Sequence, residues 1–111
     1  MKGREFLAQH EFLVMLAVLR LGREAYGVPI SAEISAKTGR EMLLGSVYDT
    51  LERLERKGLI LSRLGEATAK RGGRAKTYFK LTSDGLRELR ETQRGISALS
   101  EGLLQLGGVR L

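Results

Sequence analysis

The chain has 111 residues, of which 42% are apolar, and this predicts one small globular domain and excludes an intrinsically disordered chain. Cysteine is absent and His10 is the only histidine, which excludes disulfide bonds, thiolate chemistry and a multi-histidine metal site within one chain. The formal net charge is +6, and residues 63–80 carry six basic residues against one acidic residue. Charge concentrated in this way favours a nucleic-acid contact.

Residues 5–21 predict a first helix that is apolar over much of its circumference, so it is deeply buried or has two partners. Gly22 follows as its C-terminal stop. The longest apolar run, residues 12–19, is shorter than the roughly 20 residues that span a bilayer. No small-residue cleavage site follows this run, so we expect no signal peptide, no membrane partner and a cytoplasmic location.

Residues 26–39 predict a second, short helix. Pro29 suits its first turn, because a missing N–H costs nothing there. Ile30 and Ile34 are spaced i, i+4 and predict its buried stripe, and Gly39 ends it.

The clearest helical pattern lies in residues 45–60 and predicts a helix over residues 46–57. Ser46 is the expected N-cap, with Asp49 completing a box-like cap, and Gly58 is the stop. The buried stripe is expected at Val47, Leu51 and Leu54. This leaves an outward face made of Ser46, Asp49, Thr50, Arg53, Arg56 and Lys57.

The sequence then changes to the period of two that is typical of strands. Residues 59–65 and 75–81 predict two strands, and "EATAKRGGR" between them contains a Gly72-Gly73 turn. The result is a β-hairpin with a basic wing over residues 66–76. In the second strand, Thr77, Phe79 and Leu81 share one face, and Lys76, Tyr78 and Lys80 share the other.

A last helix is expected over residues 83–106, with Thr82 as its N-cap. Its seam of heptad type consists of Leu86, Leu89, Gln93, Ile96, Ser100 and Leu103. Such a helix would be about 36 Å long, which is more than so small a body can cover. The spare apolar length predicts a partner chain.

Three helices, a hairpin and a long helix predict a mainly α fold with a small β-hairpin (α+β). We assign residues 1–82 to a winged helix-turn-helix DNA-binding domain and residues 83–111 to a C-terminal dimerisation helix, within one compact domain overall. A helix of this fold enters the DNA major groove, and the hairpin reaches a neighbouring groove or the backbone.

Three motifs resemble the PadR family of bacterial transcriptional regulators, over about residues 6–90. They are Tyr26-Gly27, Gly45-Ser46-Val47-Tyr48 with Leu51, Leu54 and Gly58-Leu59-Ile60, and the wing from Gly73-Arg74 through Tyr78 to Leu81-Thr82. Asp49 and Ala75 stand where the family often has proline. The resemblance, which is to the short subfamily, implies a repressor.

Residues for DNA contact follow from the predicted outward face, the basic wing and the resemblance. They are Ser46, Tyr48, Asp49, Thr50, Arg53, Lys70, Arg71, Gly72, Gly73, Arg74 and Lys76. Arg53 is the best candidate for reading a guanine edge, and its alternative is an i, i+4 ion pair with Asp49. The glycines of the tip let the main chain approach phosphates. The resemblance implies a phosphate contact for Tyr48.

The first and last helices are expected to join two chains into a homodimer that binds a palindromic operator. The interface residues are Phe6, Phe12, Leu16, Leu86, Leu89, Gln93, Ile96 and Leu103. Apolar space between these helices leaves room for a small hydrophobic effector.

We expect no cofactor, no metal site and no enzymatic activity, because Glu52, Glu55 and Glu66 lack a partner base and a nucleophile. The alternative function is a winged-helix interaction module that docks an acidic protein partner. Failure to bind duplex DNA at low salt would favour that alternative.

Overall fold

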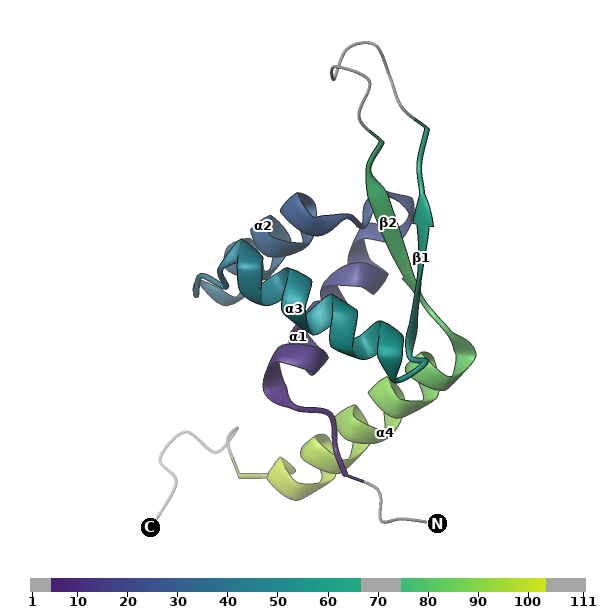
Figure 1. Cartoon of the computed structure of the whole chain (residues 1–111). Helices are drawn as coiled ribbons and strands as arrows, with labels where there is room; N and C mark the ends of the chain where they lie inside the picture. Colours follow the sequence, from purple (N-terminus) through teal and green to yellow (C-terminus); the bar gives the residue numbers. More distant parts are fainter. Residues whose placement is uncertain (1–4, 67–74, 104–111) are drawn as a thin grey trace.

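The computed structural model describes residues 5–66 and 75–103 of the chain. It confirms the predicted winged-helix architecture, mainly α with a small hairpin, and Figure 1 shows the hairpin projecting from a body of helices. The elements are α1 (Gln9–Leu21), the 3-10 helix η1 (Gly22–Glu24), α2 (Gly27–Thr38), α3 (Leu44–Arg56), β1 (Ile60–Leu64), β2 (Thr77–Leu81) and α4 (Ser83–Ser100).

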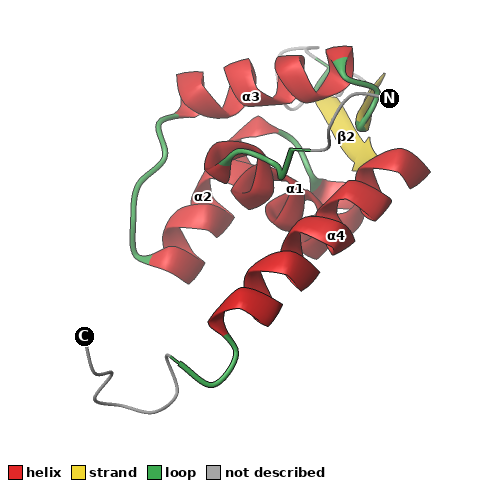
Figure 2. Ribbon diagram, turned by 90° about the horizontal axis from the view of Figure 1, so that it is seen from below, coloured by secondary structure: helices red, strands yellow, loops and turns green. Residues whose placement is uncertain are grey.

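The core forms around α1, which contacts α2, α3, α4 and β2 (Figure 2). Its fully buried residues include Val14 and Met15, which meet apolar side chains from the other elements. Leu51 and Leu54 come from α3, Phe79 from β2 and Leu89 from α4. All of these elements therefore share one hydrophobic core.

Two helix starts differ from the sequence-based expectation. Helix α1 begins at Gln9, because Leu7 N–H donates to Thr92 Oγ1 (3.1 Å) and holds the preceding residues against α4. Helix α3 begins at Leu44, where Val47 N–H donates to Leu43 O (3.0 Å). Ser46 therefore lies inside the first turn, and its prediction as the N-cap is wrong.

The predicted helix ends at Gly22 and Gly39 are confirmed. Their φ angles are 59° and 74°, values that glycine adopts at little cost and other residues avoid.

The hairpin is antiparallel, with a register that runs from Ile60 opposite Leu81 to Leu64 opposite Thr77. Both strands are shorter than expected, but the alternation is as predicted, with Phe79 buried and Lys80 exposed. Phe79 N–H also donates to the carbonyl oxygen of Ala25 (2.9 Å), just before α2. The hairpin is thus attached to the helix-turn-helix through its backbone.

Helix α4 begins as expected, because Thr82 Oγ1 accepts a hydrogen bond from Gly85 N–H (2.9 Å). It spans Ser83–Ser100, about 27 Å, whereas the prediction extended to residue 106, and residues 104–106 lie outside the described part. A Cβ at Gly85 would overlap the carbonyl oxygen of Leu59, so α4 starts in direct contact with the chain between α3 and β1. The division at residues 82 and 83 stays a prediction.

Candidate DNA-binding surface

The buried side of α3 fixes which of its residues face outward. Val47, Leu51 and Leu54 are at most 1% exposed, as predicted. Thr50 is also 1% exposed, so its predicted place on the outward face is wrong. Its position lies at the edge of the apolar stripe, next to Leu54 around the helix, and its small side chain is buried there. Thr50 therefore has no surface to offer to DNA.

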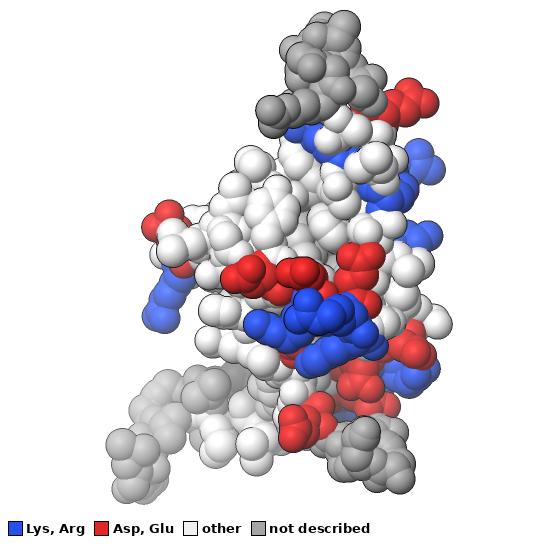
Figure 3. All heavy atoms as spheres, in the orientation of Figure 1, with Lys and Arg blue, Asp and Glu red and all other residues white. Residues whose placement is uncertain are grey.

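The exposed side of α3 carries both signs of charge. Asp49, Glu52 and Glu55 are acidic, and Arg53, Arg56 and the following Lys57 are basic. Figure 3 shows a cluster of basic side chains on the face that carries α3, bordered by acidic side chains. The helix alone therefore provides little net attraction for phosphates.

The i, i+4 ion pair on α3 joins Arg56 to Glu52, at 3.7 Å. The alternative to a guanine contact for Arg53 is the corresponding pair with Asp49, and no such pair forms between these two described residues. Arg53 is exposed and lies in the last turn of α3. Its predicted role in reading guanine stays a prediction.

The Tyr48 ring packs directly against the backbone of Gly27 on the neighbouring helix. A Cβ at Gly27 would overlap the Tyr48 hydroxyl and ring, so the ring can occupy this place only because residue 27 is glycine. The packing explains the Tyr26-Gly27 motif in physical terms. Tyr48 remains 46% exposed, at the junction of α2 and α3, while Ser46 is half-buried.

Two tyrosines and two cations form a stack at the end of the paired strands that leads into the wing. The rings of Tyr26 and Tyr78 meet edge-to-face, with centroids 5.4 Å apart. Lys76 Nζ lies 4.3 Å from the Tyr26 centroid, and the Arg63 guanidinium carbon lies 4.7 Å from the Tyr78 centroid. We call these four residues the tyrosine stack. It joins both strands to the start of α2 and fixes two positive charges at the wing base.

Sequence reasoning selected Lys76 as a DNA contact but missed Arg63 and the packing of Tyr26 against Tyr78. It could not find the stack, because its residues come from three separate segments of the chain. The predicted contacts at the tip, Lys70, Arg71, Gly72, Gly73 and Arg74, lie outside the described residues.

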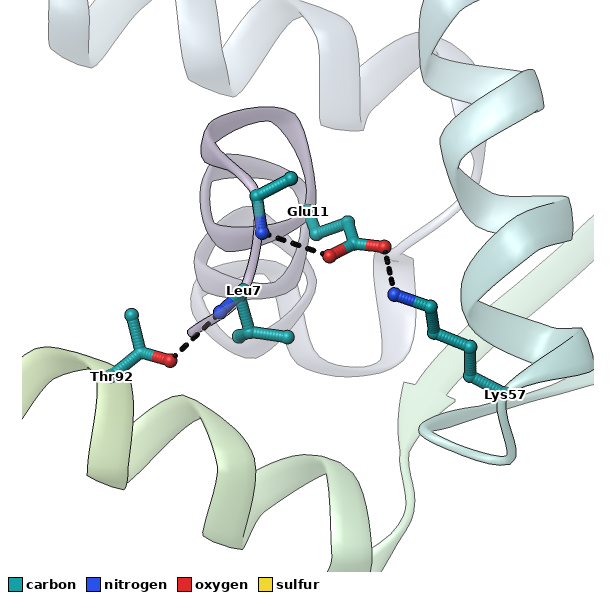
Figure 4. A network of polar contacts seen from close by, with 5 residues as sticks. Leu7, Glu11, Lys57 and Thr92 are labelled. Carbon is teal, nitrogen blue, oxygen red and sulfur yellow. Dashed lines mark hydrogen bonds and ion pairs between the residues drawn. The ribbon is translucent and has the colours of Figure 1, made fainter. Parts of the chain in front are cut away.

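Glu11, on α1, is a buried carboxylate that sequence reasoning also missed. It is 2% exposed, and its Oε2 accepts from Lys57 Nζ (2.7 Å) while its Oε1 accepts from Ala8 N–H (2.9 Å), as Figure 4 shows. The contact links the start of α1 to the end of α3. Glu11 makes one half of a capping box by accepting from the Ala8 N–H, but Ala8 has no side-chain oxygen for the other half, so the sequence shows no capping-box signature here.

Burial raises the pKa of Glu11, but other effects outweigh it. The ionised carboxylate is favoured by hydrogen bonds from Lys57 and from the Ala8 backbone, and by the positive charges of Lys57 and Arg53. The pKa of Glu11 therefore lies below its usual 4.5. Glu11 is therefore ionised at neutral pH.

The predicted interface residues differ in how far they are exposed: one is buried, five are exposed and two are half-buried. Leu89 is 4% exposed in the core of its own chain, so its assignment to a dimer interface is wrong. Gln93 and the apolar side chains of Phe6, Leu16, Ile96 and Leu103 are exposed, and those of Phe12 and Leu86 are half-buried. The Phe6 ring lies against α4, where a Cβ at Gly95 would be 2.5 Å from its Cζ. The exposed group remains available to a partner.

Among the described residues, no three His, Cys, Asp or Glu side chains lie close enough together to hold a metal ion. Within the same ranges, no helix is both long and apolar enough to cross a bilayer.

A recognition helix lies beside a β-hairpin with basic residues where its paired strands lead into the wing, and this arrangement defines a winged helix-turn-helix protein of the DNA-binding class. A family model, the transcriptional regulator PadR-like family, matches residues 15–91. The chain belongs to this family of transcriptional regulators, and the resemblance predicted from the motifs is confirmed.

Solved structures agree with this assignment. A PadR family transcriptional regulator from Eggerthella lenta is 32% identical, with 85% of this chain and 80% of that chain covered and a TM-score of 0.65. A PadR-like transcription factor from Bacteroides fragilis is 27% identical, with 82% of each chain covered and a TM-score of 0.66. A PadR family regulator from Clostridium difficile shares the fold at 22% identity, with 91% and 100% covered and a TM-score of 0.70. No curated protein sequence matches the chain.

Proposed function

We propose that the chain is a cytoplasmic homodimeric repressor that binds a palindromic operator. Each subunit places α3 in the major groove and its wing on the adjacent backbone or groove. The tyrosine stack is the observation that carries this proposal, because it holds Arg63 and Lys76 at the wing base, attached to the start of α2. With mixed charge on α3, the wing supplies most of the attraction for phosphates.

The proposed dimer forms through α1 and α4. Supporting this, Leu16, Leu19, Ile96, Leu99 and Leu103 are each at least 36% exposed on these two helices and the turn that follows α4. Apolar side chains that gather on a few elements are typical of an interface. In a twofold dimer, the two recognition helices would reach successive major grooves about 34 Å apart.

A fluorescence-anisotropy titration tests the proposal. The protein is titrated against duplex DNA from upstream of its own gene, at two salt concentrations and with excess nonspecific competitor. We expect tight binding that survives the competitor and weakens steeply with salt, as phosphate neutralisation requires. Binding that the competitor abolishes would contradict an operator-binding function and point to an acidic protein partner.

The proposal includes a small hydrophobic effector that binds between α1 and α4 of the dimer. Its support is the same exposed apolar surface, since clefts between helices are common ligand sites. A thermal-shift screen of apolar small molecules tests this part, and a screen without any stabilising compound would count against it.

A further inference from the structure

The N-terminal half of α3 has no positive charge with which to read guanine. Residues 42–52 contain no lysine or arginine, and both arginines of α3 lie in its last turn. In helix-turn-helix proteins, it is the N-terminal residues of the recognition helix that meet base edges. Here the exposed side chains of that half include Leu44 and Tyr48, 39% and 46% exposed.

These side chains belong to one continuous surface. Val28 on α2, 56% exposed, lines a shallow groove together with Leu44 on α3. Tyr48 lies one helical turn beyond Leu44, and its hydroxyl end packs against Gly27, which precedes Val28. We call Val28, Leu44 and Tyr48 the apolar patch. It covers the junction of the two helices that form the helix-turn-helix.

The patch is separate from the surface assigned to the dimer. Figure 1 shows α2 at the top of the helical body and α4 at its bottom. A dimer joined through α1 and α4 therefore leaves the patch open on the side from which the wing projects. Apolar side chains that are exposed on a DNA-recognition surface are best buried against an apolar group of the DNA.

Charge next to the patch disfavours the DNA backbone as the group that it contacts, in contrast to the phosphate contact that the resemblance implies for Tyr48. Asp49 and Glu52 are exposed on the same helix, and their carboxylates repel phosphates. Among the features that base pairs present in the major groove, the C5-methyl group of thymine is the apolar one. We propose that Leu44 and Tyr48, supported by Val28, read thymine methyl groups in the operator. This inference rests on the proposed function.

The test removes the methyl group from the DNA and leaves the protein intact. Duplexes that the wild-type protein retains from a random library are sequenced, and each preferred thymine is then replaced by deoxyuridine, one position at a time. Uracil keeps the hydrogen-bonding pattern of thymine without the methyl group. At one or more positions, we expect anisotropy titrations to show about fourfold weaker binding, the effect of losing one buried methyl-sized group.

The same titrations with Leu44→Ala complete a double-mutant cycle between side chain and methyl group. We expect this variant to bind thymine and uracil duplexes equally at the position that Leu44 contacts. Leu61→Ala is the matched control, because Leu61 is a 53% exposed leucine on the hairpin, outside the patch. It should discriminate between the two duplexes as the wild type does.

Equal binding of thymine and uracil duplexes at every position would overturn the inference and leave the proposed function standing. The inference would also be overturned if Leu44→Ala kept the full wild-type difference in affinity between thymine and uracil duplexes at every position. A wild-type protein that retains no preferred sequence from the library would overturn the proposed function, and the inference with it.

Discussion

Glu11 is a single carboxylate on which two helices and the N-terminal segment converge. Its two oxygens accept hydrogen bonds from Ala8 and Lys57, and no buried side-chain nitrogen or oxygen in the described part of the chain lacks a partner. A charge buried in this way stabilises the fold only while its donors remain in place. The residue thus connects the position of α1 to the end of the recognition helix.

Glu11→Gln should lower the free energy of unfolding by about 1–2 kcal/mol at pH 7, since an amide loses the charge interaction with Lys57. Because the folded-state pKa lies below the unfolded value, the stabilisation is present at neutral pH. It is lost as the pH falls below about 4.5 through the folded-state pKa. Urea unfolding over a pH series measures both effects, and the variant should show a flatter profile at acidic pH.

Glu52→Gln is the matched control, because Glu52 is an exposed carboxylate whose ion pair with Arg56 lies at the surface. It should change the unfolding free energy by less than about 0.5 kcal/mol. An unchanged acid profile in Glu11→Gln would mean that the buried pair does not stabilise the fold.

At the scale of elements, α4 and the hairpin are each joined to the rest of the protein by a close contact. In α4 the contact is between two stretches of main chain, and in the hairpin it includes both main chain and aromatic rings. The start of α4 rests on the carbonyl of Leu59, and the hairpin rests on Ala25 and the tyrosine stack. The first contact lies at the start of α4, and the second joins the middle of β2 to the segment before α2. They set the angles at which α4 and the wing leave the body.

Two helical glycines should respond in opposite ways to alanine. Gly85→Ala should destabilise the protein by about 1–3 kcal/mol, because its Cβ would displace the backbone at Leu59. Gly45→Ala, on α3, meets no atom within 4 Å and should stabilise by about 0.5–1 kcal/mol through helix propensity. Thermal and urea unfolding compare the two, and equal effects would contradict the close contact at Gly85.

Tyr78→Leu should remove the ring that lies between Arg63 and Tyr26. We expect a loss of about 1–2 kcal/mol in unfolding free energy, together with weaker binding to all duplex DNA as the wing base loses its fixed cations. Tyr78→Phe keeps the ring and should retain both properties. Anisotropy titrations and urea unfolding separate the two effects, and wild-type DNA binding by Tyr78→Leu would argue against a role for the stack.

At the scale of the whole molecule, the two ends of α4 differ in how much of their surface is buried. Its first half gives Gly85, Leu89 and Thr92 to the core, while Ile96 and Leu99 beyond them are 45% and 82% exposed. A monomer would leave these side chains in water. The second half is therefore the part that a second chain would cover.

Ile96→Asp should convert the proposed dimer to a monomer, because a carboxylate in an apolar interface loses its hydration without gaining a partner. Sedimentation velocity measures the change, and operator affinity should fall with it. Leu61→Asp places the same charge on an exposed leucine of the hairpin and should leave the oligomeric state unchanged. A dimer that survives in Ile96→Asp would rule out α4 as its main contact.

Sequence patterns were sufficient where one face of an element decides its structure. The stripe of Val47, Leu51 and Leu54, the alternation of β2 and the Thr82 cap depend on neighbours in sequence, and all were predicted. Glu11 could not be recognised as buried, because Lys57 lies 46 positions away.

The seam of α4 showed a related limit. Its heptad spacing indicates that Leu89 and Ile96 are both covered, but spacing does not distinguish a covering surface on the same chain from one on another. In the structure, Leu89 lies in the core and Ile96 remains exposed. The outward position predicted for Thr50 was wrong for a similar reason, since a small polar residue can lie on either side of a helix.

The attachment of the hairpin has a consequence for how DNA could be released. The hydrogen bond from Phe79 to Ala25 and the tyrosine stack connect the paired strands of the hairpin to the start of α2, and α2 packs against the recognition helix α3. A tilt of the hairpin strands against the helix-turn-helix would have to break both contacts. In the proposed dimer, an effector would instead release DNA by changing the distance between the DNA-binding surfaces of the two subunits, while each surface keeps its own shape.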